Sequence, residues 1–128
     1  IFLGYTSTNT LLHFQDNYIE QPLTPKHKIN SILMYEVPNK WKVGLEAYYF
    51  SQQKLSDGLT GSDYWIYGFM TERIFKKFSI YTNLENFTDT RQTKFDTIFT
   101  GNISRPVFRD IYAPLDGFVT NGGVKFRF

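Results

Sequence analysis

Residues 41–53 read Trp-Lys-Val-Gly-Leu-Glu-Ala-Tyr-Tyr-Phe-Ser-Gln-Gln, and the character of their side chains alternates. The odd positions are apolar up to residue 49, with Trp41, Val43, Leu45, Ala47 and Tyr49. The even positions are mixed and include Lys42 and Glu46. Successive side chains of a β-strand point to opposite faces of its sheet. The stretch therefore predicts a strand with one apolar and one mixed face.

Three further segments alternate in the same way, at residues 27–37, 78–87 and 118–128. Residues 64–72 are rich in strand-forming side chains but apolar on both parities, so their facing is not readable from the sequence. Residues 1–8 alternate weakly around Gly4 and Thr6, and we predict a strand there as well. The sequence predicts an all-β fold, an antiparallel up-and-down meander of about six strands.

The predicted connections alternate in length. Residues 38–40 and 73–77 form short turns, whereas residues 9–26, 54–63 and 88–117 form longer loops. Short and long connections are therefore expected at opposite rims of the sheet. Connections as long as 88–117 are usually functional or disordered.

Composition excludes several classes of function. The chain has 128 residues, no Cys, and 14 Lys and Arg against 12 Asp and Glu, for a formal net charge of +2. This length supports one ordinary domain, and the small charge does not favour nucleic acid as a partner. Without Cys there is no disulfide framework and no thiolate zinc site.

No catalytic or cofactor motif is present. The sequence lacks a Gly-x-Ser-x-Gly nucleophile elbow, a Walker loop and a dinucleotide glycine fingerprint. His13 and His27 flank the first long loop, but no carboxylate at a fixed spacing supports a role as metal ligands. We expect no enzymatic activity, no cofactor and no bound metal.

The positions of the charged residues indicate whether the apolar face could contact lipid. In the four clearest strands every Lys, Arg and Glu takes the mixed parity, and only His27, at a strand start, falls on the apolar one. A Lys or Arg on the lipid face near mid-membrane would cost about 2–4 kcal/mol. Several aromatic residues of the kind found at membrane interfaces occupy positions on the predicted apolar face: Tyr35, Trp41, Tyr49, Phe126 and Phe128.

These features are typical of a transmembrane β-barrel. Six strands are too few for the smallest ordinary single-chain barrel, which needs about eight. An open sheet in lipid would also leave unpaired edges. We expect residues 1–128 to be the C-terminal portion of a larger transmembrane β-barrel.

Two segments carry a resemblance to a known family. Asn83-Leu84-Glu85-Asn86-Phe87-Thr88-Asp89 is similar to the "N-L-x-N" pattern that ends the penultimate strand of TonB-dependent outer-membrane receptors. The closing Gly122-Gly123-Val124-Lys125-Phe126-Arg127-Phe128 is similar to the end of those proteins. Residues 111–117 resemble receptors of the Bacteroidetes group in particular. The chain departs from the family where Gly117 is followed by Phe118 rather than Arg.

The resemblance implies an active transporter of the Gram-negative outer membrane, which takes up a scarce ligand such as a ferric siderophore, haem, cobalamin or a glycan. It implies contact with outer-membrane lipid, and long loops that face outside. Phe126 and Phe128 would form the signal for the barrel-assembly machinery. The plug domain and the N-terminal region that contacts the TonB complex are not among these residues.

Basic residues in the longest loop are candidates for binding the extracellular ligand: Arg91, Lys94, Arg105 and Arg109. Guanidinium groups suit carboxylate and phosphate oxygens. The other interpretation is a set of solvated charges that Asp89, Asp96 and Asp110 balance, because exposed ion pairs are common and contribute little.

A soluble antiparallel barrel of the lipocalin or fatty-acid-binding type is the alternative for the whole chain. In that geometry the apolar parity, with Leu33, Leu45 and Phe126, would line an enclosed interior that binds an apolar ligand. A third possibility is an adhesive β-sheet module that assembles across chains.

Overall fold

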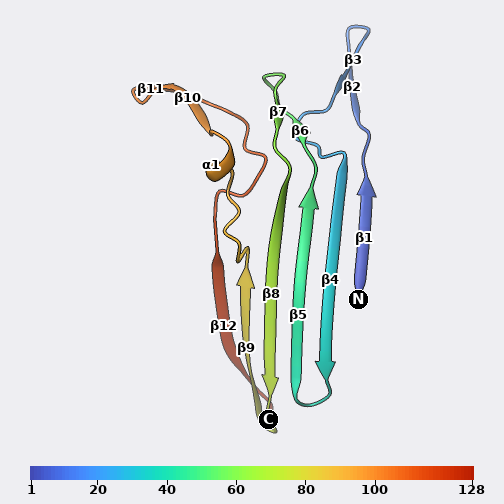
Figure 1. Ribbon diagram of the computed structural model, residues 1–128, viewed down its shortest axis with the longest axis vertical. Coiled ribbons are helices and arrows are strands. Elements are labelled where there is room, and N and C mark those ends of the chain that lie inside the picture. The colour runs from blue at the N-terminus through green and yellow to red at the C-terminus, as the bar shows by residue number, and fades with distance from the viewer.

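The computed structural model describes residues 1–128 and contains one large antiparallel sheet of six strands in the order β1-β4-β5-β8-β9-β12 (Figure 1). Its strands are β1 (Phe2–Ser7), β4 (His27–Val37), β5 (Trp41–Phe50), β8 (Tyr64–Ile74), β9 (Phe78–Glu85) and β12 (Val119–Phe126). Neighbours in the sheet follow their order along the chain, so the predicted all-β meander is confirmed.

The predicted strand at 41–53 was too long. β5 ends at Phe50, and the backbone N–H of Ser51 still donates to the carbonyl oxygen of His27 on β4 at 3.0 Å. Gln53 and Lys54 instead form β6 (Gln53–Lys54), which pairs with β7 (Thr60–Gly61). The bounds of β4 match the prediction, and those of the remaining strands differ from it by one or two residues.

The connections lie as expected at opposite ends of the sheet, with short turns at one end and three long connections at the other (Figure 1). The long connections were predicted as loops, but each one contains local structure. The first contains β2 (Leu11–Phe14) and β3 (Asn17–Glu20), and the second contains β6 and β7. The third contains α1 (Gln92–Phe95), β10 (Phe99–Asn102) and β11 (Arg105–Phe108). No helix in the chain has the length and apolar character needed to cross a membrane.

The strand register sorts the side chains of the sheet into two continuous faces. One face carries the odd positions of β1, β4, β5 and β8 and the even positions of β9 and β12, and we define it as the apolar face. These positions lie opposite one another from strand to strand across the whole sheet. The opposite positions form the mixed face. Of the eight Lys, Arg, Asp and Glu residues in these strands, the mixed face carries seven: Lys28, Glu36, Lys42, Glu46, Glu72, Glu85 and Lys125.

Arg73 is the exception, and it lies at the short-turn end of the apolar face, where it pairs with Trp41. Its guanidinium carbon stands 4.2 Å from the centroid of the Trp41 ring. Such cation–π contact accommodates a charge beside an apolar surface. The sequence did not show which positions of β8 face which side. Residue 73 was also predicted to lie in a turn, so the position of Arg73 on the apolar face was not expected.

The two faces also differ in exposure. On the apolar face, Leu33, Leu45 and Phe126 are 50%, 42% and 67% exposed, whereas Glu72 and Ser79 on the mixed face are 9% and 1% exposed. β1 and β12 each pair on one side only, so the sheet is open. The side chains that a soluble barrel would enclose are therefore exposed on one face of an open sheet.

Candidate functional site

The third long connection, which carries the predicted binding residues, is held together by the buried side chain of Gln92 in α1. Its Oε1 accepts hydrogen bonds from the backbone N–H groups of Tyr112, at 2.8 Å, and Ala113, at 3.1 Å. Its Nε2 donates to the carbonyl oxygen of Asp110 at 2.8 Å. One amide side chain thus satisfies three backbone groups of the returning chain, which fixes the loop in one conformation.

Tyr112 connects the third connection to the second. Its hydroxyl group donates to Asp96 and accepts from the backbone N–H of Ser62, both at 2.8 Å. Its ring lies so close to Gly61 that a Cβ atom there would stand 2.6 Å from it. Burial is the main cause that raises the pKa of this tyrosine. The hydroxyl therefore stays protonated at neutral pH and can donate to Asp96.

The contacts around Tyr112 form a small core over the mixed face. Tyr112 and Ala113 pack with Leu55 and Tyr64, and Phe50 and Ile66 of the sheet lie against this cluster. The hydroxyl of Tyr64 also donates to the carbonyl oxygen of Tyr112 at 2.8 Å. The second and third connections thus fold over the mixed face.

Arg91 and Lys94, two of the predicted binding residues, meet at Asp89. Nη2 of Arg91 lies 2.8 Å from Oδ2 of Asp89, and Nζ of Lys94 contacts the same oxygen. The other carboxylate oxygen accepts from the backbone N–H of Phe118 at 3.2 Å. The hydrogen bond from Lys94 is the main cause that holds the pKa of Asp89 below its usual range. These two cations thus brace the base of the loop through a shared carboxylate.

The other two predicted cations lie apart from that pair. Nη1 of Arg109 lies 2.9 Å from Asp96 and its Nε lies 3.5 Å from Asp57, so this cation joins two connections. Arg105 is exposed on β11 and takes part in none of the ion pairs. The four cations therefore do not converge on one pocket, and their role in ligand binding stays a prediction. Asp110, which was expected to balance them, accepts a hydrogen bond from the backbone of Ser56.

The two histidines make contacts with aromatic neighbours. Nδ1 of His27 is hydrogen-bonded to the hydroxyl of Tyr5 at 2.8 Å, and His13 stacks on Tyr18 with 4.8 Å between ring centroids. No group of three or more His, Asp or Glu side chains is placed so that it could hold a metal ion.

The predicted assembly signal lies at the short-turn end. Phe126 is the last residue of β12 and faces Phe78 on the apolar face, with 6.4 Å between ring centroids. Phe128 extends beyond the strand and is fully exposed.

Asn86 explains part of the motif that carries the family resemblance. Its φ is 49°, in the left-handed region that Asn tolerates better than most residues. Its Oδ1 accepts from the backbone N–H of Thr90 at 2.9 Å, and its Nδ2 donates to the carbonyl oxygens of Thr90 and Asp116. This side chain therefore binds the beginning of the third connection to its end. The motif is visible in the sequence, but the hydrogen bonds of Asn86 to both ends of the connection are not predictable from it.

Comparison of the chain with protein-family models, with curated proteins and with solved structures gave no match.

Proposed function

We propose that residues 1–128 form the C-terminal wall of an outer-membrane β-barrel that belongs to a TonB-dependent receptor. In this arrangement the apolar face contacts lipid and the mixed face lines the interior. The long connections face outside the cell and the short turns face the periplasm. The whole receptor would import a scarce ligand, and it would obtain energy from the TonB complex through parts of the protein other than residues 1–128.

The observation that carries the proposal is that nearly all charged side chains of the six-stranded sheet lie on one of its two faces. Seven of its eight Lys, Arg, Asp and Glu residues lie on the mixed face, as the register defines it, and the apolar face is exposed. A soluble sheet exposes its polar face and covers its apolar one. An exposed apolar face, with the charged side chains gathered on the opposite face, is typical of a wall between lipid and an aqueous lumen.

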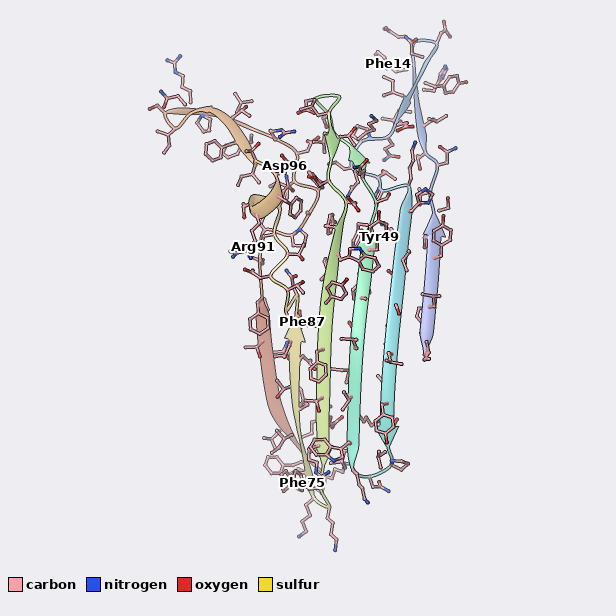
Figure 2. All side chains as sticks on the ribbon, viewed as in Figure 1. Phe14, Tyr49, Phe75, Phe87, Arg91 and Asp96 are labelled. Atoms are coloured by element: carbon pink, nitrogen blue, oxygen red, sulfur yellow. The ribbon has the colours of Figure 1, made fainter.

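Aromatic rings at two levels of the apolar face support a membrane setting. Tyr49 lies near the long connections (Figure 2). Its ring centroid stands 4.9 Å from that of Trp65, and Trp41 begins the same strand at its opposite end. Eight residues separate Tyr49 from Trp41, which corresponds to about 26 Å along a strand, or about 20 Å of height at a tilt of 40°. The apolar band of outer-membrane barrels is about 25 Å tall and is flanked by such aromatic girdles.

The open edges of the sheet indicate that further strands complete it. β1 and β12 carry one free edge each. In hydrocarbon each unpaired backbone group costs several kcal/mol, so an edge has to be closed by another strand. Additional strands of the same receptor would pair with both edges and close the barrel.

The assignment to a receptor rests on the resemblance of residues 83–89 and 122–128, together with the length of the connections. The third connection is held by Gln92 and Asn86, and Tyr112 joins it to the second connection. Fixed outer loops suit the capture of an extracellular ligand, because a rigid site loses less conformational entropy on binding.

Site-directed spin labelling tests the membrane arrangement. Residues 1–128 contain no Cys, so Leu45→Cys and Glu46→Cys, in a receptor with any Cys elsewhere replaced by Ser, each give one label, on opposite faces of β5. In the full-length receptor in lipid vesicles, we expect the label at 45 to be accessible to oxygen dissolved in the bilayer. We expect the label at 46 to be accessible to a water-soluble nickel reagent. Equal access of the nickel reagent to both labels would refute the proposal.

A further inference from the structure

A polar cavity of about 230 Å³ opens at the long-connection end, between the first and second connections. Eleven residues line it and none of them is hydrophobic. Four are Thr, four carry side-chain amides, and the remaining three are Glu20, Lys26 and Lys54. This composition is unusual for a ligand site, since such sites are mostly apolar with a few polar groups.

Three of the amides are free to bind a ligand. Asn9, Gln21 and Gln52 line the cavity, and their side chains make no hydrogen bond within the protein. An amide side chain offers both donors and an acceptor, and a hydroxyl group is likewise both donor and acceptor. Several amides around one space therefore suit a molecule with several hydroxyl groups.

The charged groups of the cavity are already occupied. Nζ of Lys26 lies 2.6 Å from Oε1 of Glu20, and Nζ of Lys54 donates to the hydroxyl of Thr60 at 3.0 Å. The hydrogen bond from Lys26 is the main cause that lowers the pKa of Glu20, which keeps this pair ionised at neutral pH. Glu20 and Lys26 neutralise one another, so Lys54 is the one charge of the lining without a counter-ion, beside eight neutral polar side chains.

The walls of the cavity are held in place before any ligand binds. The backbone N–H of Thr8 donates to Lys26, that of Gln21 to Thr10, and that of Leu23 to Lys54, at 2.9, 3.0 and 2.9 Å. Each of these bonds joins segments that are separate along the chain. A site with fixed walls loses less entropy on binding.

The segment around Leu23 is also strained. Leu23 has a φ of 58°, which is uncommon for a bulky residue, and it lies between Pro22 and Pro25. Its bond to Lys54 holds this conformation at the edge of the cavity. Such strain persists where the surrounding structure imposes it, and it is concentrated at ligand sites.

We infer that this cavity binds a small, neutral molecule with several hydroxyl groups, such as one sugar ring. A cavity of about 230 Å³ has room for a single ring. For a ligand of about a dozen heavy atoms the expected dissociation constant is low millimolar. The chemical class of the ligand follows from the cavity, whereas its role as a first contact site outside the cell rests on the proposed function.

The test is saturation-transfer difference NMR on the full-length protein in detergent micelles, with glucose, galactose and mannose as neutral probes and glucuronate and glucosamine as charged ones. We expect at least one neutral sugar to bind at low millimolar concentration. We expect Asn9→Ala and Gln52→Ala to weaken binding of that sugar about three- to tenfold each, because each substitution removes a hydrogen bond to the ligand. Asn102→Ala, at an exposed amide on β10 outside the cavity, should leave the affinity unchanged.

Three outcomes would overturn the inference: no neutral sugar binds, a charged sugar binds more tightly than every neutral one, or the cavity variants bind as tightly as the unmodified protein. Hydrogen exchange on each variant checks that the fold is kept. Sugar binding together with water access to both faces of β5 would overturn the proposed function alone. Lipid access to the apolar face without sugar binding would overturn this inference alone.

Discussion

Gln92 holds the backbone of Tyr112, whose N–H donates to Oε1 of Gln92 at 2.8 Å, and these residues belong to opposite arms of the third connection. Gln92→Ala would leave the backbone N–H groups of Tyr112 and Ala113 without partners. A buried polar group that loses its hydrogen bond costs about 1–3 kcal/mol. We expect the substitution to open the third connection locally while the sheet stays folded. Amide hydrogen exchange should show lost protection at Tyr112 and Ala113, with β5 and β8 unchanged.

A matched control is Gln52→Ala, which removes an exposed amide that makes no hydrogen bond within the protein. This variant should keep full protection at Tyr112. If Gln92→Ala kept it as well, the hydrogen bonds of Gln92 would not be what orders the loop.

A charge on the apolar face provides a second prediction. Leu33 lies near the middle of β4 and Val37 at its short-turn end, and both belong to the apolar face. In lipid, Leu33→Arg should lower the free energy of unfolding by about 2–4 kcal/mol, whereas Val37→Arg near the interface should cost about 0–1 kcal/mol. Urea unfolding of the full-length protein from lipid vesicles measures both values. Equal costs at the two positions would contradict a membrane boundary near Val37.

The sheet could be predicted because its signal is local. Alternation with a period of two, as at Val43, Leu45 and Ala47, follows from strand geometry and is readable in a single segment. β8 did not carry this signal, because both its parities are apolar. Its facing becomes clear only when the register places Trp65 against Tyr49.

The site could be predicted only in part. Basic residues in the third connection were recognised by residue type, but the separation of Arg105 from Arg91 depends on how the loop folds. The burial of Gln92 and its hydrogen bonds could not be predicted from the sequence, because a single Gln forms no periodic pattern. Its partners also lie 18 to 21 residues away along the chain. The polar cavity is likewise formed by segments that are remote along the chain.

The ionic cluster at Asp89 gives a pH dependence whose sign follows from its lowered pKa. The ordinary value is 3.8, and contact with Lys94 and Arg91 holds the pKa of the folded state below it. The ionised carboxylate therefore stabilises the loop fully above the ordinary value. That contribution is lost as the pH falls from there through the lower pKa of the folded state. Hydrogen exchange at Phe118, whose N–H donates to Asp89, should show protection that falls in this acid window.

Asp89→Asn should reduce that pH dependence, because the amide does not ionise. Glu20→Gln serves as the control, since Glu20 also has a lowered pKa but its partner is Lys26 in the first connection. It should leave the acid profile of Phe118 unchanged. An unaltered profile in Asp89→Asn would show that another group governs the acid sensitivity of this loop.

Removal of Phe128 separates a signal for assembly from a contribution to stability. Phe128 lies beyond β12 and is fully exposed, so its loss should change the free energy of unfolding by no more than about 0.5 kcal/mol. If the residue is recognised by the assembly machinery, its deletion should nevertheless lower the amount of full-length receptor in the outer membrane several-fold. Ile103→Ala is a suitable control, because Ile103 is 87% exposed at the tip of a loop and carries no such signal. Surface levels in cells, measured beside unfolding of the purified protein, distinguish the two effects, and an unchanged surface level after deletion of Phe128 would refute the assembly role.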